Sequence, residues 1–240
     1  LTDTVTQIKL PFIPEQILPN VDGRGYGLFI PDAKSLAWML LNWYTISDDT
    51  ERLAVLMTLY ENYLADNIAD YEWLNSLFNG IVIEKNPLIA SSVVSYFSMP
   101  LQTYQGMERT LAEKKLLHIA LSHALGSCRT QLMRVLIANH VSPMLSEQLY
   151  EIWNKQNNEQ LNENDYTTLA YELCVRCPEK CNDILSTQRM RITNPDRLRQ
   201  FDFISRAVVS DTTQLDLLFN SLLMAENRRI EPWTAMTLSY

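Results

Sequence analysis

Glycine and histidine are scarce in this sequence. Six glycines occur among 240 residues, and three of them are Gly23, Gly25 and Gly27. A long glycine-poor stretch favours helices over sheets, because hairpin turns and bulges consume glycine. The three histidines form no H-E-x-x-H motif, and no G-x-S-x-G motif occurs, so a zincin site and a serine-nucleophile elbow are both missing. We therefore expect no complete active site in this chain.

Two other absences concern partners and location. The net charge is −8, and an acidic protein lacks the clustered basic surface that phosphate binding needs, so we expect no nucleic-acid partner. No apolar run reaches the roughly 18 residues of a membrane span, and no signal peptide opens the chain, so we expect no membrane partner. The compartment stays open between cytoplasm and periplasm. The first residue is Leu1 rather than Met, which suggests a processed chain or a fragment.

The cysteines offer one metal-binding hypothesis. Cys174, Cys177 and Cys181 form a C-x2-C-x3-C pattern, whose thiolates are close enough in sequence to hold zinc or an iron–sulfur cluster. A structural zinc site needs a fourth ligand, and no His or further Cys lies nearby. Small cysteines at helical spacing are more often buried in a core. We expect core packing and no metal in this chain, and keep metal binding as the less favoured reading.

Helical signals recur from residue 31 onward. The segment 48–64 (DDTERLAVLMTLYENYL) repeats apolar residues at helical spacing, and proline opens further helices at Pro87, Pro143 and Pro195. The predicted helices are 32–44, 48–67, 71–84, 87–98, 106–126, 128–140, 143–156, 163–175, 178–187, 195–209, 211–227 and 231–240.

These helices predict an all-α fold. They are too many for one bundle and their connectors are short, so antiparallel pairs stacked into an α-solenoid of the HEAT or armadillo kind are the natural arrangement. The first 30 residues differ, because Val5–Phe12 and Gly25–Ile30 read as strands. We predict two domains: 1–30, a short β remnant or linker from a preceding β-sandwich domain, and 31–240, a superhelical helical domain.

A specific family resemblance lies at this junction. The segment Pro19–Asp32 (PNVDGRGYGLFIPD) leads directly into the helical array. It resembles the passage from the β-sandwich to the C-terminal helical domain in M1-family zinc aminopeptidases, and the later helices also look similar. The residues that carry the resemblance at the junction are Asn20, Asp22, Gly23, Gly25, Tyr26 and Phe29.

The resemblance implies that this chain has a non-catalytic role. In that family the helical domain closes over the catalytic domain and limits peptide access. Zinc, the catalytic H-E-x-x-H and the G-x-M-E-N loop belong to the upstream part, so the expected partners are the chain's own catalytic domain and a peptide substrate. The chain alone should be inactive and hold no cofactor.

Basic residues concentrate in the later helices, where Arg189, Arg191 and Arg197 belong to a local excess of positive charge. Such residues usually form a solvated helix face with mixed charge pairs, and we favour that reading. The resemblance makes the three arginines candidates for the substrate cavity, where they would meet an anionic group such as a carboxylate.

The alternative is a free-standing HEAT-like scaffold that binds a protein or peptide on its concave face. The sequence encoded before Leu1 separates the two hypotheses, because only the peptidase requires an upstream H-E-x-x-H.

Overall fold

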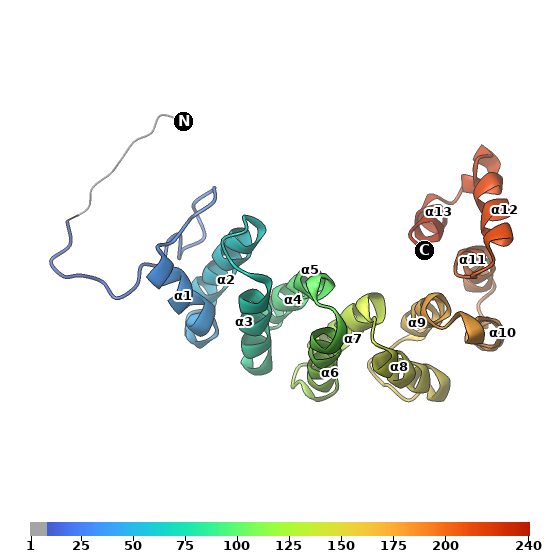
Figure 1. Ribbon diagram of the computed structural model, residues 1–240, viewed down its shortest axis with the longest axis horizontal. Helices are drawn as coiled ribbons and strands as arrows, with labels where there is room; N and C mark the ends of the chain where they lie inside the picture. Colours follow the sequence, from blue (N-terminus) through green and yellow to red (C-terminus); the bar gives the residue numbers. More distant parts are fainter. Residues whose placement is uncertain (1–8) are drawn as a thin grey trace. The chain divides into compact units, whose positions relative to one another are not determined.

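The structure, a computed structural model, describes residues 9–240 and divides into two compact units, Leu1–Tyr96 and Phe97–Tyr240. Its helices are labelled in Figure 1. The first unit holds α1 (Ala33–Asn42), α2 (Asp49–Leu64), α3 (Asp70–Ile83) and α4 (Pro87–Tyr96). The second unit holds α5 (Ser98–Thr103), α6 (Gly106–Ser122), α7 (Gly126–Asn139), α8 (Pro143–Lys155), α9 (Glu163–Arg176), α10 (Cys181–Arg191), α11 (Pro195–Ile204), α12 (Thr212–Leu222) and α13 (Glu231–Leu238). Short 3-10 turns lie at Trp43–Thr45, Pro178–Lys180, Ser205–Ala207 and Ala225–Arg228.

The all-α fold class is confirmed, because residues 9–240 contain helices and no strand. The strand predicted at 25–30 is wrong: that segment is a loop without ladder hydrogen bonds. The strand predicted at 5–12 lies mostly outside the described residues. The solenoid arrangement stays a prediction. The predicted domain boundary at residue 30 separates this loop from α1, whereas the division into compact units falls between Tyr96 and Phe97.

The N-terminal loop is organised by one asparagine. Asn20 has a left-handed backbone conformation, with φ of 54°. Its side-chain oxygen accepts from the Gly25 N–H at 2.6 Å and its Nδ2 donates to the Gly25 carbonyl at 3.2 Å. Its own carbonyl accepts from the Gly23 N–H at 2.9 Å. Asn20 and Gly23, with φ of 67°, tolerate this conformation better than other residues, and a Cβ on Gly25 would overlap the Asn20 and Phe29 side chains. The N-x-D-G-x-G sequence therefore fits this loop.

The core of the first unit is built around Trp43. Its ring is fully buried, and its Nε1 donates to Ser76 Oγ at 3.0 Å, which in turn donates to the Leu40 carbonyl at 2.7 Å. A Cβ on Gly80 of α3 would overlap the Trp43 ring. Glycine at this position therefore lets α3 approach the turn that follows α1.

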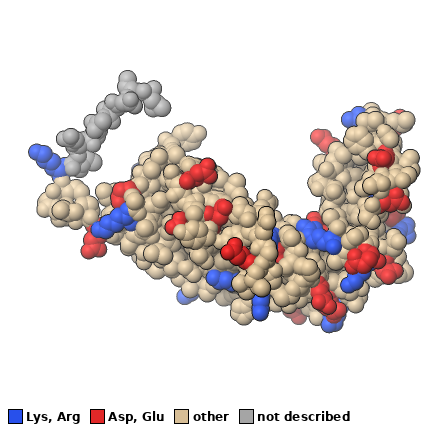
Figure 2. Space-filling view, in the orientation of Figure 1, with Lys and Arg blue, Asp and Glu red and all other residues tan. Residues whose placement is uncertain are grey.

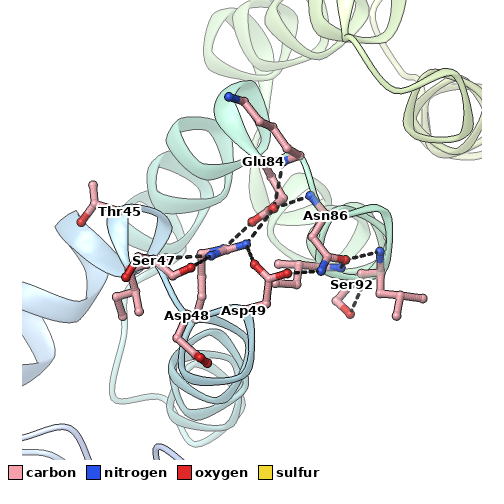
Figure 3. A network of polar contacts seen from close by, with 12 residues as sticks. Thr45, Ser47, Asp48, Asp49, Glu84, Asn86 and Ser92 are labelled. Carbon is pink, nitrogen blue, oxygen red and sulfur yellow. Dashed lines mark hydrogen bonds and ion pairs between the residues drawn. The ribbon is translucent and has the colours of Figure 1, made fainter.

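A polar network ties the start of α2 to the α3–α4 connection (Figure 3). Glu84, whose side chain is 2% exposed, accepts from Arg52 Nε at 2.8 Å and from the Asn86 N–H at 2.7 Å. Arg52 also pairs with Asp49, and Asn86 Nδ2 donates to Asp49 at 2.6 Å. Each charged group in this network has partners within the unit, so its evident role is structural.

In the second unit, helices that follow one another along the chain also pack on one another. Helix α6 contacts α7 and α8, α7 contacts α9, α8 contacts α9, and α9 contacts α10. Towards the end of the unit, α11 contacts α10 and α13. These contacts join helices that are nearest or next-nearest neighbours along the chain. No helix in residues 9–240 has the length and apolar character required to cross a membrane.

Candidate functional site

The structure does not bring the three predicted arginines together. Arg189 makes a bidentate ion pair with Asp202, with Nε to Oδ1 at 2.8 Å and Nη2 to Oδ2 at 2.9 Å, and both side chains are exposed. On the face drawn in Figure 2, basic side chains lie among acidic ones and gather into no large patch of one sign. A solvated face with mixed pairs, the favoured reading of the sequence, describes Arg189 well.

Arg191 caps the C-terminal end of α8. Its Nη1 donates to the Trp153 carbonyl and its Nη2 to the Asn154 carbonyl, both at 3.0 Å. The guanidinium also lies over the Trp153 ring, 4.6 Å from the centroid. A cation that binds the free carbonyls at a helix C-terminus stabilises that helix, so Arg191 has a packing role at the end of α8.

Arg197 lines a cavity. This cavity has a volume of about 230 Å³ and lies between α9, α11 and α13. Its walls combine buried apolar residues, such as Phe201 and Ile204, with polar side chains, such as Thr168 and Gln200. The Arg197 charge is balanced, because Nη1 lies 3.0 Å from Glu163 Oε2.

A second feature, which the sequence did not indicate, is the loop between α7 and α8. Three charged side chains hold its backbone, and we call them the loop clamp: Arg109 and Glu113 from α6, and Arg176 from α9. Glu113 accepts from the backbone N–H groups of Val141 at 2.8 Å and Ser142 at 3.1 Å, and from the Ser142 hydroxyl.

The two arginines of the loop clamp bind carbonyls at the end of α7 and at the start of the loop that follows it. Arg109 donates to the Leu101 and Asn139 carbonyls and, at 2.7 Å, to Glu113. Arg176 donates to the His140 carbonyl at 2.5 Å and the Ala138 carbonyl at 3.1 Å. Burial raises the pKa of Glu113, but the hydrogen bonds from Ser142 and Arg109 outweigh it, so the net pKa is lowered and the group remains a carboxylate.

Two hollows flank the clamped loop. One, of about 790 Å³, is lined by residues that include Gln102, Gln105, Thr110 and Asn139. The other, of about 470 Å³, lies on the side of α9 and includes Tyr150. Val141, Pro143 and Arg176 line both hollows. The walls of the larger hollow offer amide and hydroxyl groups, whereas those of the smaller one carry charged side chains of both signs.

His140 lies inside the clamped loop with no exposed surface. Its Nδ1 is 2.9 Å from the Ile137 carbonyl, which makes Nδ1 the protonated nitrogen, and its Nε2 has no hydrogen-bond partner among the described residues. Burial, together with the nearby Arg176 charge, lowers its pKa to about 4. A neutral, buried imidazole of this kind is part of the packing.

The cysteine trio makes core contacts. Cys174 and Cys181 are buried, and Cys177 is partly exposed. Cys174 Sγ lies 3.6 Å from the Cys181 carbonyl, and Cys181 Sγ lies 3.8 Å from the Val208 carbonyl. Burial raises the pKa of the Cys174 thiol well above its ordinary value, which keeps it protonated. Within residues 9–240, no three His, Cys, Asp or Glu side chains gather closely enough to hold a metal ion.

Comparison of this chain with protein-family models, with curated proteins and with solved structures finds no match.

Proposed function

We propose that this chain is the non-catalytic C-terminal helical domain of an M1-type metallo-aminopeptidase, an enzyme that releases N-terminal amino acids from peptides. In this role it covers the catalytic domain and shapes peptide access. The zinc and the catalytic residues belong to the partner domain, and the helical domain acts by packing, exclusion of water and restriction of entry.

The observation that carries the proposal is the uncovered apolar surface of the N-terminal loop. Single exposed apolar residues are normal on a soluble protein, but a dense series of them in one segment marks a surface that another body covers. Ile13 is 95% exposed and Tyr26 106% exposed. The exposed apolar residues of this loop are Leu10, Phe12, Ile13, Ile17, Tyr26, Leu28 and Ile30.

The later part of the loop, from Asn20 to Phe29, is a formed element. Asn20 brackets Gly25 with two hydrogen bonds, and Asn62 on α2 donates to the Phe29 carbonyl at 2.8 Å. The Asn20–Phe29 part of the loop is thus fixed against α2, while Tyr26 and Leu28 within it remain exposed. A preceding domain packed on this loop would remove those side chains from water, at about 25 cal/mol for each Å² of apolar surface covered.

The test is the activity of the whole product of the gene that encodes this chain. We expect the purified product to contain zinc and to hydrolyse leucine or alanine p-nitroanilide, and chain 1–240 alone to do neither. Addition and removal of zinc should switch the activity of the whole product. A whole product without zinc-dependent hydrolysis, or an active chain 1–240, would overturn the proposal.

The second candidate is the free-standing scaffold, which the two hollows beside the clamped loop favour. The amide and hydroxyl groups of the larger hollow and the charged side chains of the smaller one can bind a peptide without any catalytic partner. An inactive gene product in which no H-E-x-x-H precedes the chain would support the scaffold in place of the peptidase.

A further inference from the structure

The first unit contains four aromatic rings in mutual contact, which we call the aromatic cluster: Tyr60 and Tyr63 from α2, Trp73 from α3 and Tyr96 from α4. Within it, Tyr60 and Tyr96 lie face to face, with ring centroids 3.9 Å apart and an interplanar angle of 17°. Aromatic pairs in proteins usually have centroids about 4.5–7 Å apart. These two phenol rings are therefore in closer face-to-face contact than most aromatic pairs.

This pair is also the accessible part of the aromatic cluster. Tyr60 and Tyr96 are partly exposed, whereas Trp73 is fully buried and Tyr63 is 7% exposed. Burial raises the pKa of Tyr96, and the charge of an ionised Tyr60 raises it further, so the two hydroxyl ends lie near each other. A small oxidant in solution thus meets two tyrosines whose rings and hydroxyl groups are side by side.

Tyrosine rings in such contact are arranged for radical coupling. Each phenol loses one electron to the oxidant and its hydroxyl proton to water, which leaves a phenoxyl radical whose unpaired electron is shared with the carbons ortho to the oxygen. Two such radicals form a C–C bond between ortho carbons. The hydrogen on each bonded carbon then leaves as a proton and each oxygen regains one, so the pair gives up two electrons and two protons in total. Reacting groups that the fold holds together couple far faster than the same groups free in solution.

We propose that Tyr60 and Tyr96 are a site of oxidative modification, at which a one-electron oxidant, such as a peroxidase acting with hydrogen peroxide, joins the two rings as dityrosine. The peroxide takes up the two electrons and two protons and leaves as two molecules of water. The new bond links α2 to α4 and closes a loop of chain that contains α3, so oxidation fastens the first unit covalently. The site is independent of the proposed function, because it needs neither a peptide nor a catalytic partner.

A second pair of tyrosines provides an internal comparison. Tyr171 and Tyr240 in the second unit meet edge to face, with centroids 5.7 Å apart and an interplanar angle of 64°. Tyr171 is only 1% exposed, so a dissolved oxidant does not reach its ring. We expect this pair to stay unlinked under conditions that link Tyr60 to Tyr96.

The experiment is photo-oxidation of dilute chain 1–240 with ruthenium(II) tris-bipyridyl and persulfate, which accepts the electrons and leaves as sulfate. The monomeric product is isolated by size, digested with trypsin and analysed by mass spectrometry. Tyr60 lies in the tryptic peptide 53–85 and Tyr96 in the peptide 86–109, so the link joins two separate peptides. We expect a joined peptide that is lighter by two hydrogens than the sum of the two, with fragments that place the bond at Tyr60 and Tyr96.

Two variants test the assignment. Tyr96→Phe keeps a ring in the stack and removes the hydroxyl whose oxidation the coupling requires, so the yield of the joined peptide should fall about tenfold or more. Tyr44→Phe is the matched control and should leave the yield unchanged, because Tyr44 is another partly exposed tyrosine of the first unit but lies against Trp43. In concentrated urea, which separates the rings, the yield from the unmodified chain should also fall, and this arm decides the matter if Tyr96→Phe does not fold.

Absence of the joined peptide from the oxidised monomer, an equal yield in urea, or a yield that survives in a folded Tyr96→Phe variant would overturn the inference. A link between Tyr171 and Tyr240 in place of the one between Tyr60 and Tyr96 would overturn it as well. None of these results bears on the proposed function, whose test is zinc-dependent hydrolysis by the whole gene product.

Discussion

Replacement of Glu113 by alanine should be among the most destabilising single changes in the second unit. The Arg109–Glu113 pair has an N–O distance of 2.7 Å, and its side chains are 5% and 1% exposed. The change removes the carboxylate that accepts from Arg109, Val141 and Ser142, and leaves the Arg109 guanidinium buried without its counter-ion. Loss of one partner of a buried ion pair costs about 3–5 kcal/mol. We expect the free energy of unfolding to fall by that amount.

The chain supplies a matched control. Glu151 and Lys155 form an ion pair with the same helical spacing and the same 2.7 Å distance, but their side chains are 50% and 59% exposed. Exposed pairs contribute about 1 kcal/mol or less, so Glu151→Ala should change little. Urea unfolding followed by far-UV circular dichroism measures both variants. Equal costs for the two variants would refute the reasoning, because the pairs share spacing and distance, whereas Glu113 is buried and also binds Val141 and Ser142.

Two further predictions concern buried residues. The contribution of His140 to the stability of the chain should fall by about 3 kcal/mol as the pH is lowered from 6.5 to 4. His140 stays neutral in the folded state down to a pKa of about 4, whereas the unfolded state takes up the proton first. The measurement is the free energy of unfolding across that pH range. Its decrease due to His140 should disappear in His140→Asn and persist in His118→Asn, which changes an exposed residue of α6. Gly80→Ala should destabilise the first unit by about 1–3 kcal/mol, since the new methyl group overlaps the Trp43 ring. Gly126→Ala is the control, because its new methyl group would have its nearest contact at 3.5 Å. Its stability, measured by thermal unfolding, should lie within about 1 kcal/mol of the parent. A larger cost at Gly126 would contradict this explanation of Gly80.

The helix pattern could be predicted from sequence because its signals are local. Proline after a capping residue correctly predicted where α4, α8 and α11 begin. In each helix the Asn or Ser side chain before the proline accepts a hydrogen bond from a backbone N–H, as expected. Helix α5 was missed, because Pro100 inside a short segment indicates a break rather than a helix. The segment 25–30, wrongly predicted as a strand, has the apolar residues and flanking glycines that are typical of strands and turns. It has no partner strand, since Asn20 closes the loop on itself.

The candidate site was much less accessible to sequence reasoning. Arg189 and Arg191 belong to a real local excess of basic residues, but their partners Asp202 and Trp153 are 13 and 38 positions away in sequence. The loop clamp has the same property, because Arg176 reaches the His140 carbonyl across 36 positions. Only the i, i+4 spacing of Arg109 and Glu113 was visible in the sequence, and spacing alone does not distinguish a buried pair from an exposed one.

The central claim is that this chain packs on a catalytic partner through its N-terminal loop. Hydroxyl-radical footprinting, normalised with an added tyrosine peptide, measures the exposure of that loop directly. In chain 1–240, Phe12, Ile13 and Tyr26 should be oxidised readily, in keeping with exposed fractions of 66%, 95% and 106%. In the whole gene product the account predicts that the same three side chains are protected at least severalfold. Equal oxidation in the two proteins would contradict it.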